Sequence, residues 1–217
     1  MSSFVLLSGG LDSSVLAYLL AREEPDLRAV YVDHGTMSAK AETHAATAVA
    51  RNLGIDIKII DISGFWPSFG NVTVGKIGGM TSSAIAPSAG ILVAVNYAGW
   101  AGADTVYLGI HADDLAGRPW LKDLVAHYQE AVRCIQPSLT GSPPGGDEFR
   151  NFSIKLPFET RTKSEIITLG RTLGVDFGDT VSCPFAANGH CGVCYVCNAR
   201  RSAFIAAGVA DTTKYAG

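Results

Sequence analysis

A short apolar run, a glycine-rich turn and a helical pattern open the chain, and this order constrains its fold most. The apolar run at residues 4–7 has the length of a buried strand, and serines and glycines follow it directly. Apolar side chains then recur at helical spacing, at Leu11, Val15, Leu16, Tyr18 and Leu19. Glycines let the backbone approach an anion closely, and the free amides of a helix N-terminus favour negative charge. The first strand-to-helix turn is therefore predicted to bind an anion.

The same turn carries further polar groups. Ser8, Ser13 and Ser14 supply hydroxyl donors, whereas Asp12 fits an anion site only if it shapes the loop or meets a cation. A plain glycine turn capped by Ser or Asp is the alternative. The run differs from the G-x-x-x-x-G-K-[ST] loop but matches S-G-G-x-D-S, and so resembles the pyrophosphate loop of the ATP pyrophosphatases. That resemblance implies an ATP site at Ser8, Gly9, Gly10, Leu11, Asp12, Ser13 and Ser14.

Strand and helix patterns alternate along the rest of the chain. Strands are expected at residues 29–32, 57–60, 105–109 and 152–156, and helices at residues 11–22, 40–53, 83–103, 121–136 and 162–174. This alternation predicts a Rossmann-like α/β fold, in which helices cover both faces of a parallel sheet. Ligands of such sheets lie at the carboxyl ends of the strands, near the topological switch point, and we expect Ser8, Asp33 and Gly109 at that edge.

The expected organisation is one main domain with a small appendage. Residues 1–180 are assigned to the nucleotide-binding α/β domain, and residues 181–217 to a C-terminal segment packed on it. Glycine-rich stretches at residues 70–81 and 140–146 are expected to be loops. The length of 217 residues suits this organisation, because it provides one sizeable core.

Composition and charge narrow the cellular context. The net charge of −3 argues against a broad nucleic-acid surface. The most apolar stretch, residues 89–103, is too short for a typical membrane span and contains Asn96, so a buried helix is expected there. Residues 1–3 lack the basic start of a signal peptide. These features predict a cytoplasmic protein with no membrane partner.

Four of the five cysteines crowd the C-terminal segment, at Cys183, Cys191, Cys194 and Cys197. The spacing C-x7-C-x2-C-x2-C brings four thiolates to one point, which suits a structural Zn²⁺ in a reducing compartment more than disulfides. His190 in place of one cysteine, or an iron–sulfur cluster, are the alternatives. Cys134 stands alone on a helical pattern and is expected to be a core residue.

The cysteine tail and the opening turn together resemble the 7-cyano-7-deazaguanine synthases, and the similarity spans nearly the whole chain. The tail carries Ser182-Cys183, the run from His190 to Cys197, Arg200-Arg201-Ser202-Ala203-Phe204 and Ala207-Gly208-Val209. Further matching stretches are Tyr107-Leu108-Gly109-Ile110 with Asp114 and Gly117, Pro157-Phe158, Thr162-Lys163-Ser164-Glu165-Ile166-Ile167, and Leu173-Gly174-Val175.

This resemblance implies an activity and roles for particular residues. The family adenylates the carboxylate of 7-carboxy-7-deazaguanine with ATP and Mg²⁺, ammonia displaces AMP to give an amide, and a second ATP dehydrates the amide to a nitrile. Ser8, Gly10, Asp12 and Ser13 would cradle the pyrophosphate, and Lys163 would stabilise charge over the phosphates unless it is a solvated lysine at a helix start. Asp33 would help to bind the adenosine or cap the next turn. A homodimer is also expected.

Three segments depart from the family pattern on the expected acceptor side. Ala89-Gly90 replaces an Arg-Asn pair, Gly35-Thr36 replaces a Gly-Gln turn, and residues 117–122 replace Gly-Tyr-Pro-Asp-Cys-Arg. The expected deazaguanine pocket is lined by His111, Asp114, Ala89 and Gly90. The smaller side chains leave room for an amine bulkier than ammonia.

Several functions therefore stay open at this point. Relatives of the family are associated with bacterial antiphage defence, which makes an amine of a partner protein an alternative acceptor, while simple divergence with the same reaction is the other reading. An amidating or tRNA-thiolating enzyme with the same loop, and a non-catalytic nucleotide-binding protein, are further alternatives. The lone Cys134 and the net acidity argue against thiolation. Retention of Asp12, Ser13 and Lys163 argues against a non-catalytic protein.

Overall fold

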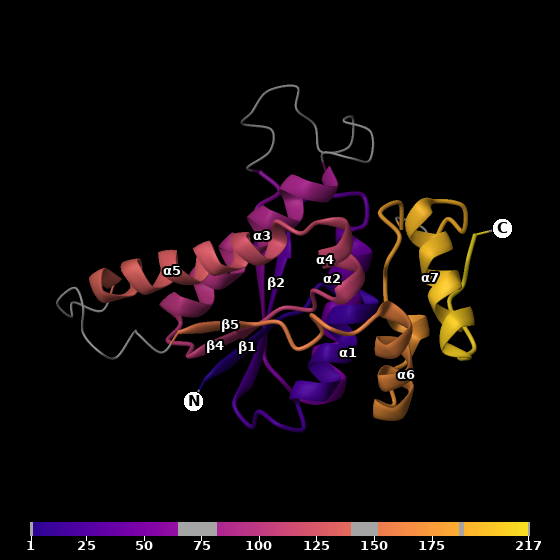
Figure 1. The fold of residues 1–217 in the computed structure, drawn as a ribbon, viewed down its shortest axis with the longest axis horizontal. Helices are drawn as coiled ribbons and strands as arrows, with labels where there is room; N and C mark the ends of the chain where they lie inside the picture. The colour runs from indigo at the N-terminus through magenta and orange to yellow at the C-terminus, as the bar shows by residue number, and fades with distance from the viewer. Residues whose placement is uncertain (1, 65–81, 140–151, 187–188, 217) are drawn as a thin grey trace.

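The chain folds around a five-stranded sheet whose strands are all parallel (Figure 1). The structure is a computed structural model that describes residues 2–64, 82–139, 152–186 and 189–216. The strands are β1 (Ser3–Leu6), β2 (Leu27–Asp33), β3 (Ile57–Asp61), β4 (Thr105–Tyr107) and β5 (Ser153–Lys155). This confirms the predicted α/β class.

The strand order β3-β2-β1-β4-β5 creates a switch point beside the first strand. From β1 the chain moves outward through β2 to β3, and then crosses to the other side of β1 to form β4 and β5. The connections after β1 and β4 therefore leave the same edge of the sheet in opposite directions. Such a switch point opens a crevice at the carboxyl ends of the strands, which is where ligands of this architecture bind.

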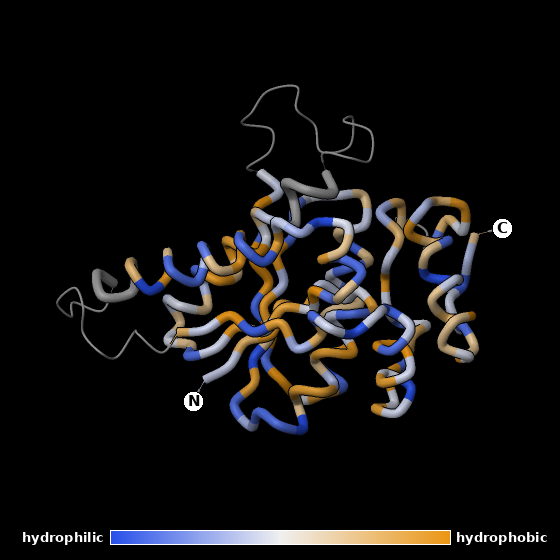
Figure 2. Tube along the Cα trace, viewed as in Figure 1, coloured by the Kyte–Doolittle hydropathy of each residue, from blue (hydrophilic) through white to orange (hydrophobic). Residues whose placement is uncertain are grey.

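Two layers of helices bury the two faces of the sheet. On one face, a core cluster joins the sheet to α1 (Leu11–Leu20), α2 (Ala39–Leu53), α6 (Lys163–Leu173) and α7 (Tyr195–Ala207). On the other face, a second cluster packs α3 (Ser82–Trp100) and α5 (Leu121–Leu139) against the strands. Figure 2 shows hydrophobic residues gathered in the strands and on the inner sides of the helices.

The predicted elements agree with the observed ones to within a few residues, with three omissions and two corrections. The omitted elements are α4 (Ala112–Gly117), the 3-10 helix η3 (Phe177–Asp179) and α7. Cys134 is exposed, so its placement in the core was wrong: it lies on an outer side of α5. The expected buried helix at residues 89–103 ends at Trp100, and Leu92 and Trp100 are exposed, because only one of its sides meets the sheet.

The expected glycine-rich loops at residues 70–81 and 140–146 lie outside the described residues. Among the residues that are described, no helix combines the length and the hydropathy needed to cross a membrane.

Candidate functional site

The glycine-rich turn after β1 and the turn after β4 meet at the switch point. A Cβ atom on Gly109 would lie 3.2 Å from the amide nitrogen of Ser13 and 3.3 Å from its Cα. The backbone after β4 therefore packs directly on the first turn of α1, an approach that only glycine permits without displacement. Ser8, Asp33 and Gly109 lie at the carboxyl ends of β1, β2 and β4, as predicted.

Hydrogen bonds among its own residues shape the first turn. The Ser13 hydroxyl lies 3.0 Å from the Ser8 hydroxyl, accepts a hydrogen bond from the Ser8 amide at 3.2 Å, and donates to the Gly10 carbonyl at 3.2 Å. The Gly10 amide donates to the Ser8 hydroxyl over a long 3.3 Å. Leu11 and Ser14 are buried beneath the turn in the first turn of α1. The turn thus presents amides and hydroxyls in a fixed arrangement at a helix N-terminus, as an anion site requires.

A lysine from far along the chain reaches this turn. The Lys163 Nζ lies 2.7 Å from Asp12 Oδ2, and Lys163 is the first residue of α6. Asp12 Oδ1 is buried and has no hydrogen-bond partner among the described residues. The pair therefore brings a cation and an unsatisfied carboxylate oxygen to the edge of the glycine turn, where a phosphate or a bound cation would find a partner.

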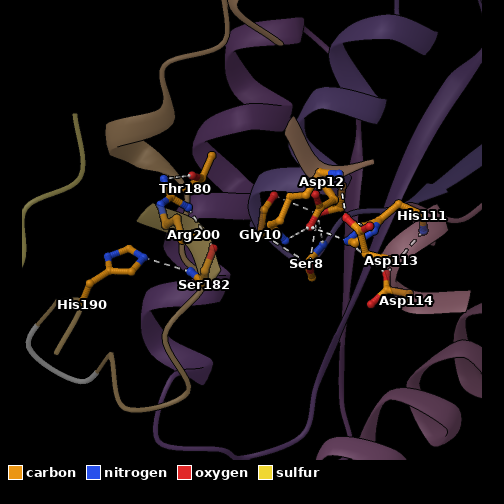
Figure 3. A network of polar contacts seen from close by, with 12 residues as sticks. Ser8, Gly10, Asp12, His111, Asp113, Asp114, Thr180, Ser182, His190 and Arg200 are labelled. Carbon is orange, nitrogen blue, oxygen red and sulfur yellow. Dashed lines mark hydrogen bonds and ion pairs between the residues drawn. The ribbon is translucent and has the colours of Figure 1, made fainter. Parts of the chain in front are cut away.

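His111 lies beside three acidic residues, Asp12, Asp113 and Asp114 (Figure 3). It is buried, with its Nε2 3.3 Å from Asp114 Oδ2 and 3.8 Å from Asp12 Oδ2. Its Nδ1 lies 3.8 Å from Asp113 Oδ2, and Asp113 also accepts the backbone amide of Lys163 at 2.9 Å. Sequence reasoning chose His111 and Asp114 but missed Asp113. The sequence carries little signal for Asp113, because the helix whose first turn holds it, α4, has only 6 residues and too little periodicity to recognise.

The other proposed acceptor residues lie elsewhere. A Cβ atom on Gly90 would meet His34 Nε2 at 2.7 Å, so Gly90 packs on the turn after β2 rather than beside His111. Burial lowers the pKa of His34, which favours its neutral form there. The described contacts do not join Ala89 and Gly90 to His111 or Asp114, and the expected common pocket stays a prediction.

Asp33 performs the turn-capping role that the sequence left open. Its Oδ1 accepts the amide of Gly35 at 2.7 Å. The residue also lines an open groove of about 670 Å³, together with Lys40, His44 and Ser63 among others. Turn capping and contact with a nucleoside in this groove are compatible, because a carboxylate offers several acceptor positions.

The four C-terminal cysteines form a compact cluster, as predicted. The Sγ atoms of Cys183, Cys191, Cys194 and Cys197 all lie within 4.8 Å of one another. Cys183 and Cys194 are 3.9 Å apart, and Cys191 and Cys197 are 4.0 Å apart. Tetrahedral bonds of about 2.3 Å to one ion would separate the sulfurs by roughly 3.8 Å. The donor set therefore fits a single metal ion, and it leaves no coordination position for chemistry.

The protonation of these thiols is uneven. Backbone amides of Val193 and Cys194 lower the pKa of the Cys191 thiol to about 6. Burial raises the pKa values of Cys183 and Cys197. A metal ion would remove the protons from all four, because a coordinated thiol is deprotonated.

His190 takes no part in the cysteine cluster. Its Nε2 accepts the backbone amide of Ser182 at 3.0 Å, and burial lowers its pKa to about 4. The alternative in which His190 replaces a cysteine finds no support in this arrangement.

Two solved structures share this fold. The U34-tRNA thiolase NcsA from Methanococcus maripaludis, solved with its [4Fe-4S] cluster, matches 95% of this chain with a TM-score of 0.56 and 18% identity. The NH3-dependent NAD synthetase from Campylobacter jejuni matches 80% of this chain with a TM-score of 0.50 and 21% identity, and this chain spans 64% of that synthetase. These likenesses and the strand order define the class of fold: an α/β protein with a parallel sheet and a glycine-rich turn after its first strand.

Sequence comparisons narrow this class to one family. The family model of the queuosine biosynthesis protein QueC matches residues 89–208, and that of asparagine synthase matches residues 3–64. The 7-cyano-7-deazaguanine synthase of Thiobacillus denitrificans is 35% identical, covering 99% of this chain and 98% of that protein. Its counterpart in Azotobacter vinelandii is also 35% identical, covering 97% and 96%. The chain therefore belongs to the QueC family, as its residues predicted.

Proposed function

We propose that this protein is an ATP-dependent ligase that adenylates the carboxylate of 7-carboxy-7-deazaguanine and transfers it to a nitrogen nucleophile. With ammonia as nucleophile, the first product is 7-amido-7-deazaguanine, and a second ATP activates the amide oxygen, which leaves with AMP to give 7-cyano-7-deazaguanine. Family membership supports the substrate class. The observation that carries the proposal is the Lys163–Asp12 pair, held 2.7 Å apart at the edge of the glycine turn.

The chemistry explains why a phosphate-binding turn is needed. A carboxylate oxygen attacks the α-phosphorus of ATP, and the bond to pyrophosphate breaks. The nitrogen nucleophile then attacks the activated carbonyl carbon, loses a proton, and displaces AMP. In this proposal the amides and hydroxyls of Ser8, Gly10 and Ser13 hold the leaving pyrophosphate. Lys163 neutralises negative charge in the transition state.

Metal ions enter this proposal at two places. Carboxylate oxygens are ligands that Mg²⁺ prefers, and the buried Oδ1 of Asp12 lacks a protein partner among the described residues. Asp12 would therefore hold the Mg²⁺ that accompanies ATP and partly neutralises its phosphates. The four cysteines would hold a structural Zn²⁺. The short sulfur–sulfur distances favour one ion over an iron–sulfur cluster, whose several irons spread the thiolates further apart.

On the acceptor side, His111 and Asp114 are the candidates for recognising the deazaguanine. Asp114 is partly exposed and offers carboxylate acceptors for the donor edge of a purine-like base. Leaving one such group unpaired on binding a wrong base costs about 1–3 kcal/mol. Transfer to an amine of a partner protein, as in an antiphage system, is the alternative outcome. The small residues Ala89 and Gly90 motivate it.

The adenylation step is tested with variants of the turn and its lysine. Asp12→Ala, Ser13→Ala and Lys163→Met should each lower ATP consumption at least about 100-fold, the usual effect of removing one group that stabilises transition-state charge. Lys58→Met is the matched control, because Lys58 is exposed in the edge strand β3, and it should keep activity. The nucleotide products should be AMP and pyrophosphate. Release of ADP and phosphate by the unmodified protein would contradict adenylation.

The identity of the product separates the remaining alternatives. The protein is incubated with ATP, Mg²⁺ and 7-carboxy-7-deazaguanine, with and without ammonia, and the products are identified by mass spectrometry. A free amide or nitrile supports the ammonia-using reaction. A mass gain of one deazaguanine amide on a co-expressed partner protein supports conjugation instead. Conversion of ATP to AMP and pyrophosphate without any amide, nitrile or protein conjugate would exclude both the ammonia-using reaction and conjugation.

A further inference from the structure

Arg200 of α7 is fully buried and holds one stretch of backbone through several hydrogen bonds. Its Nη1 donates to the Ser182 hydroxyl at 2.8 Å. Its Nη2 donates to the Phe177 carbonyl at 2.8 Å and to the Thr180 hydroxyl at 2.9 Å. The Nε donates to the Thr213 hydroxyl at 2.8 Å. A buried guanidinium is costly unless its donors are satisfied, and here every nitrogen has a partner.

The stretch that Arg200 holds, residues 177–183, is called here the connecting segment. It ends at Cys183, the first residue of the cysteine cluster, and Ser182 beside it also donates its amide to His190. Figure 3 shows Arg200, Thr180 and Ser182 grouped on one side of the glycine turn. The connecting segment therefore lies between the cysteine cluster and the turn.

Val181 of the connecting segment contacts the glycine turn directly. The amide of Val181 donates to the carbonyl of Gly9 at 2.9 Å. A Cβ atom on Gly10 would lie 3.5 Å from the Val181 carbonyl oxygen, so the two backbones are in close contact. Val181 stands between Thr180 and Ser182, whose hydroxyls both accept from Arg200. Arg200 thus forms hydrogen bonds with the connecting segment on both sides of the Val181–Gly9 contact.

The contact fixes the direction of one amide of the turn. The Gly9 carbonyl and the Gly10 N–H belong to the same planar peptide group, so holding the carbonyl also sets where the N–H points. The Gly10 N–H faces the Ser8 hydroxyl over 3.3 Å, on the side of the turn where the Ser8 and Ser13 hydroxyls gather. That amide is a donor for a phosphate in the proposed site.

We propose that Arg200 is a positioning residue, which acts through the connecting segment and the Val181–Gly9 hydrogen bond to hold the glycine turn in its phosphate-binding conformation. The inference rests on the proposed function for the identity of the ligand. It also links the cysteine segment to the nucleotide site, because Arg200 and Cys183 hold the connecting segment from α7 and from the cluster.

Two variants at Val181 test the contact itself. Val181→Pro removes the N–H and sets a ring carbon against the Gly9 carbonyl, whereas Val181→Ala keeps the N–H and shortens only the side chain. Proline is compatible with the preceding residue, because Thr180 has extended angles of φ −92° and ψ 144°. Hydrogen–deuterium exchange of a peptide covering residues 8–16 is measured without nucleotide, and equilibrium binding of ATP is measured separately.

Val181→Pro should speed exchange in residues 8–16 and weaken ATP binding at least about tenfold, which corresponds to about 1.4 kcal/mol. Val181→Ala should stay within about twofold of the unmodified protein in both measurements. Unchanged exchange at residues 8–16 in a folded Val181→Pro protein would overturn the inference. If the unmodified protein binds no ATP, the proposed function fails, but the exchange measurement still decides whether the turn is held in this way.

Arg200 itself is tested against its neighbour on the same helix. Arg201 donates to the Gly192 carbonyl at 2.7 Å and stacks over Tyr215. Neither interaction involves the connecting segment. Arg200→Met should speed exchange in residues 8–16 and raise the KM for ATP more than it lowers kcat. Arg200→Lys should restore part of the exchange protection and part of the affinity for ATP. Arg201→Met should leave exchange at residues 8–16 unchanged. Equal effects from both methionine variants would overturn the role of Arg200. If Arg200→Met does not fold, the comparison of Val181→Pro with Val181→Ala decides whether the connecting segment holds the glycine turn.

Discussion

At the scale of single residues, Gly9 is the position where the turn tolerates least change. Its φ of +72° lies in the left-handed region that disfavours side chains. A Cβ atom there would lie 2.6 Å from the Glu42 carbonyl oxygen and 2.8 Å from both Ala45 Cβ and the Ala46 amide. The turn is therefore pressed against the backbone of α2, and that contact requires glycine.

Gly9→Ala should destabilise the protein more than Gly54→Ala does. Both residues have positive φ, so both substitutions carry a backbone cost of about 1–2 kcal/mol. Gly54, with φ +67°, has no atom within 4 Å of an added Cβ, and only Gly9 adds a clash. Urea unfolding of the two variants measures this difference. Equal losses would show that α2 moves aside freely. Gly54→Ala should keep ATP consumption, and Gly9→Ala should lose it.

At the scale of elements, the start of α6 sets the position of Lys163. Thr162 caps the helix, and its hydroxyl accepts the Glu165 amide at 3.4 Å while Glu165 accepts the Thr162 amide at 2.7 Å. These reciprocal bonds form a capping box. They fix the first turn of α6, from which Lys163 reaches Asp12.

The stabilisation from Glu165 should depend on pH. The hydrogen bonds from the Thr162 amide and hydroxyl lower the pKa of Glu165 in the folded protein below its ordinary value of 4.5. A lowered folded-state pKa means that the charged group stabilises the fold above pH 4.5, and that this contribution is lost as the pH falls through the folded-state pKa. Urea unfolding should show Glu165→Gln less stable than the unmodified protein at pH 7, with the difference shrinking below about pH 4. A constant difference would contradict this.

A second element, the cysteine segment, should depend on its metal ion. Cys191→Ser should lose bound zinc and loosen residues 183–216, because metal binding and folding are coupled at such sites. Cys134→Ser is the matched control, since Cys134 is exposed on α5 and outside the cluster, and it should keep the metal. Elemental analysis of purified protein and proteolysis of the C-terminus measure both effects. Absence of zinc from the unmodified protein, or a coloured iron cluster, would contradict the assignment.

At the scale of the whole molecule, the sheet order brings separate segments to one edge. The turn after β1 and the turn after β4 meet at the switch point, and Gly90 of α3 packs on His34 in the turn that follows β2. The nucleotide half of the proposed site is built from close contacts. In the acceptor half of the proposed site, Ala89 is half-buried within α3. The expected homodimer stays a prediction.

A larger side chain at Ala89 should impair transfer to the acceptor without impairing ATP binding. Ala89→Arg should leave ATP binding within about twofold, a difference of roughly 0.4 kcal/mol, because no described contact joins Ala89 to the glycine turn. It should block transfer to a large amine while ammonia-dependent product formation suffers less. Product analysis by mass spectrometry with both nucleophiles measures this. Loss of ATP binding in a folded Ala89→Arg protein would place Ala89 in the nucleotide half instead.

Local patterns by themselves determined the five strands, the first turn and the cysteine cluster. Each of these depends on residues close together in the chain: apolar periodicity, a glycine run, or cysteines three positions apart. Short elements such as α4 were missed, because six residues carry too little periodicity to recognise. The helix α7 was missed because its start overlaps the cysteine spacing, with Cys194 at its N-cap.

Only the tertiary structure decided which distant residues meet. Asp113 accepts the amide of Lys163 fifty positions later, and Arg200 reaches back to Phe177 and Thr180. The exposure of Cys134 was decided in the same way, by the side of α5 that meets the sheet. Periodicity shows that a helix has an apolar face, but the path of the chain through the sheet determines what that face contacts. The physical reason is that contacts between separate segments depend on strand order, and no local pattern records strand order.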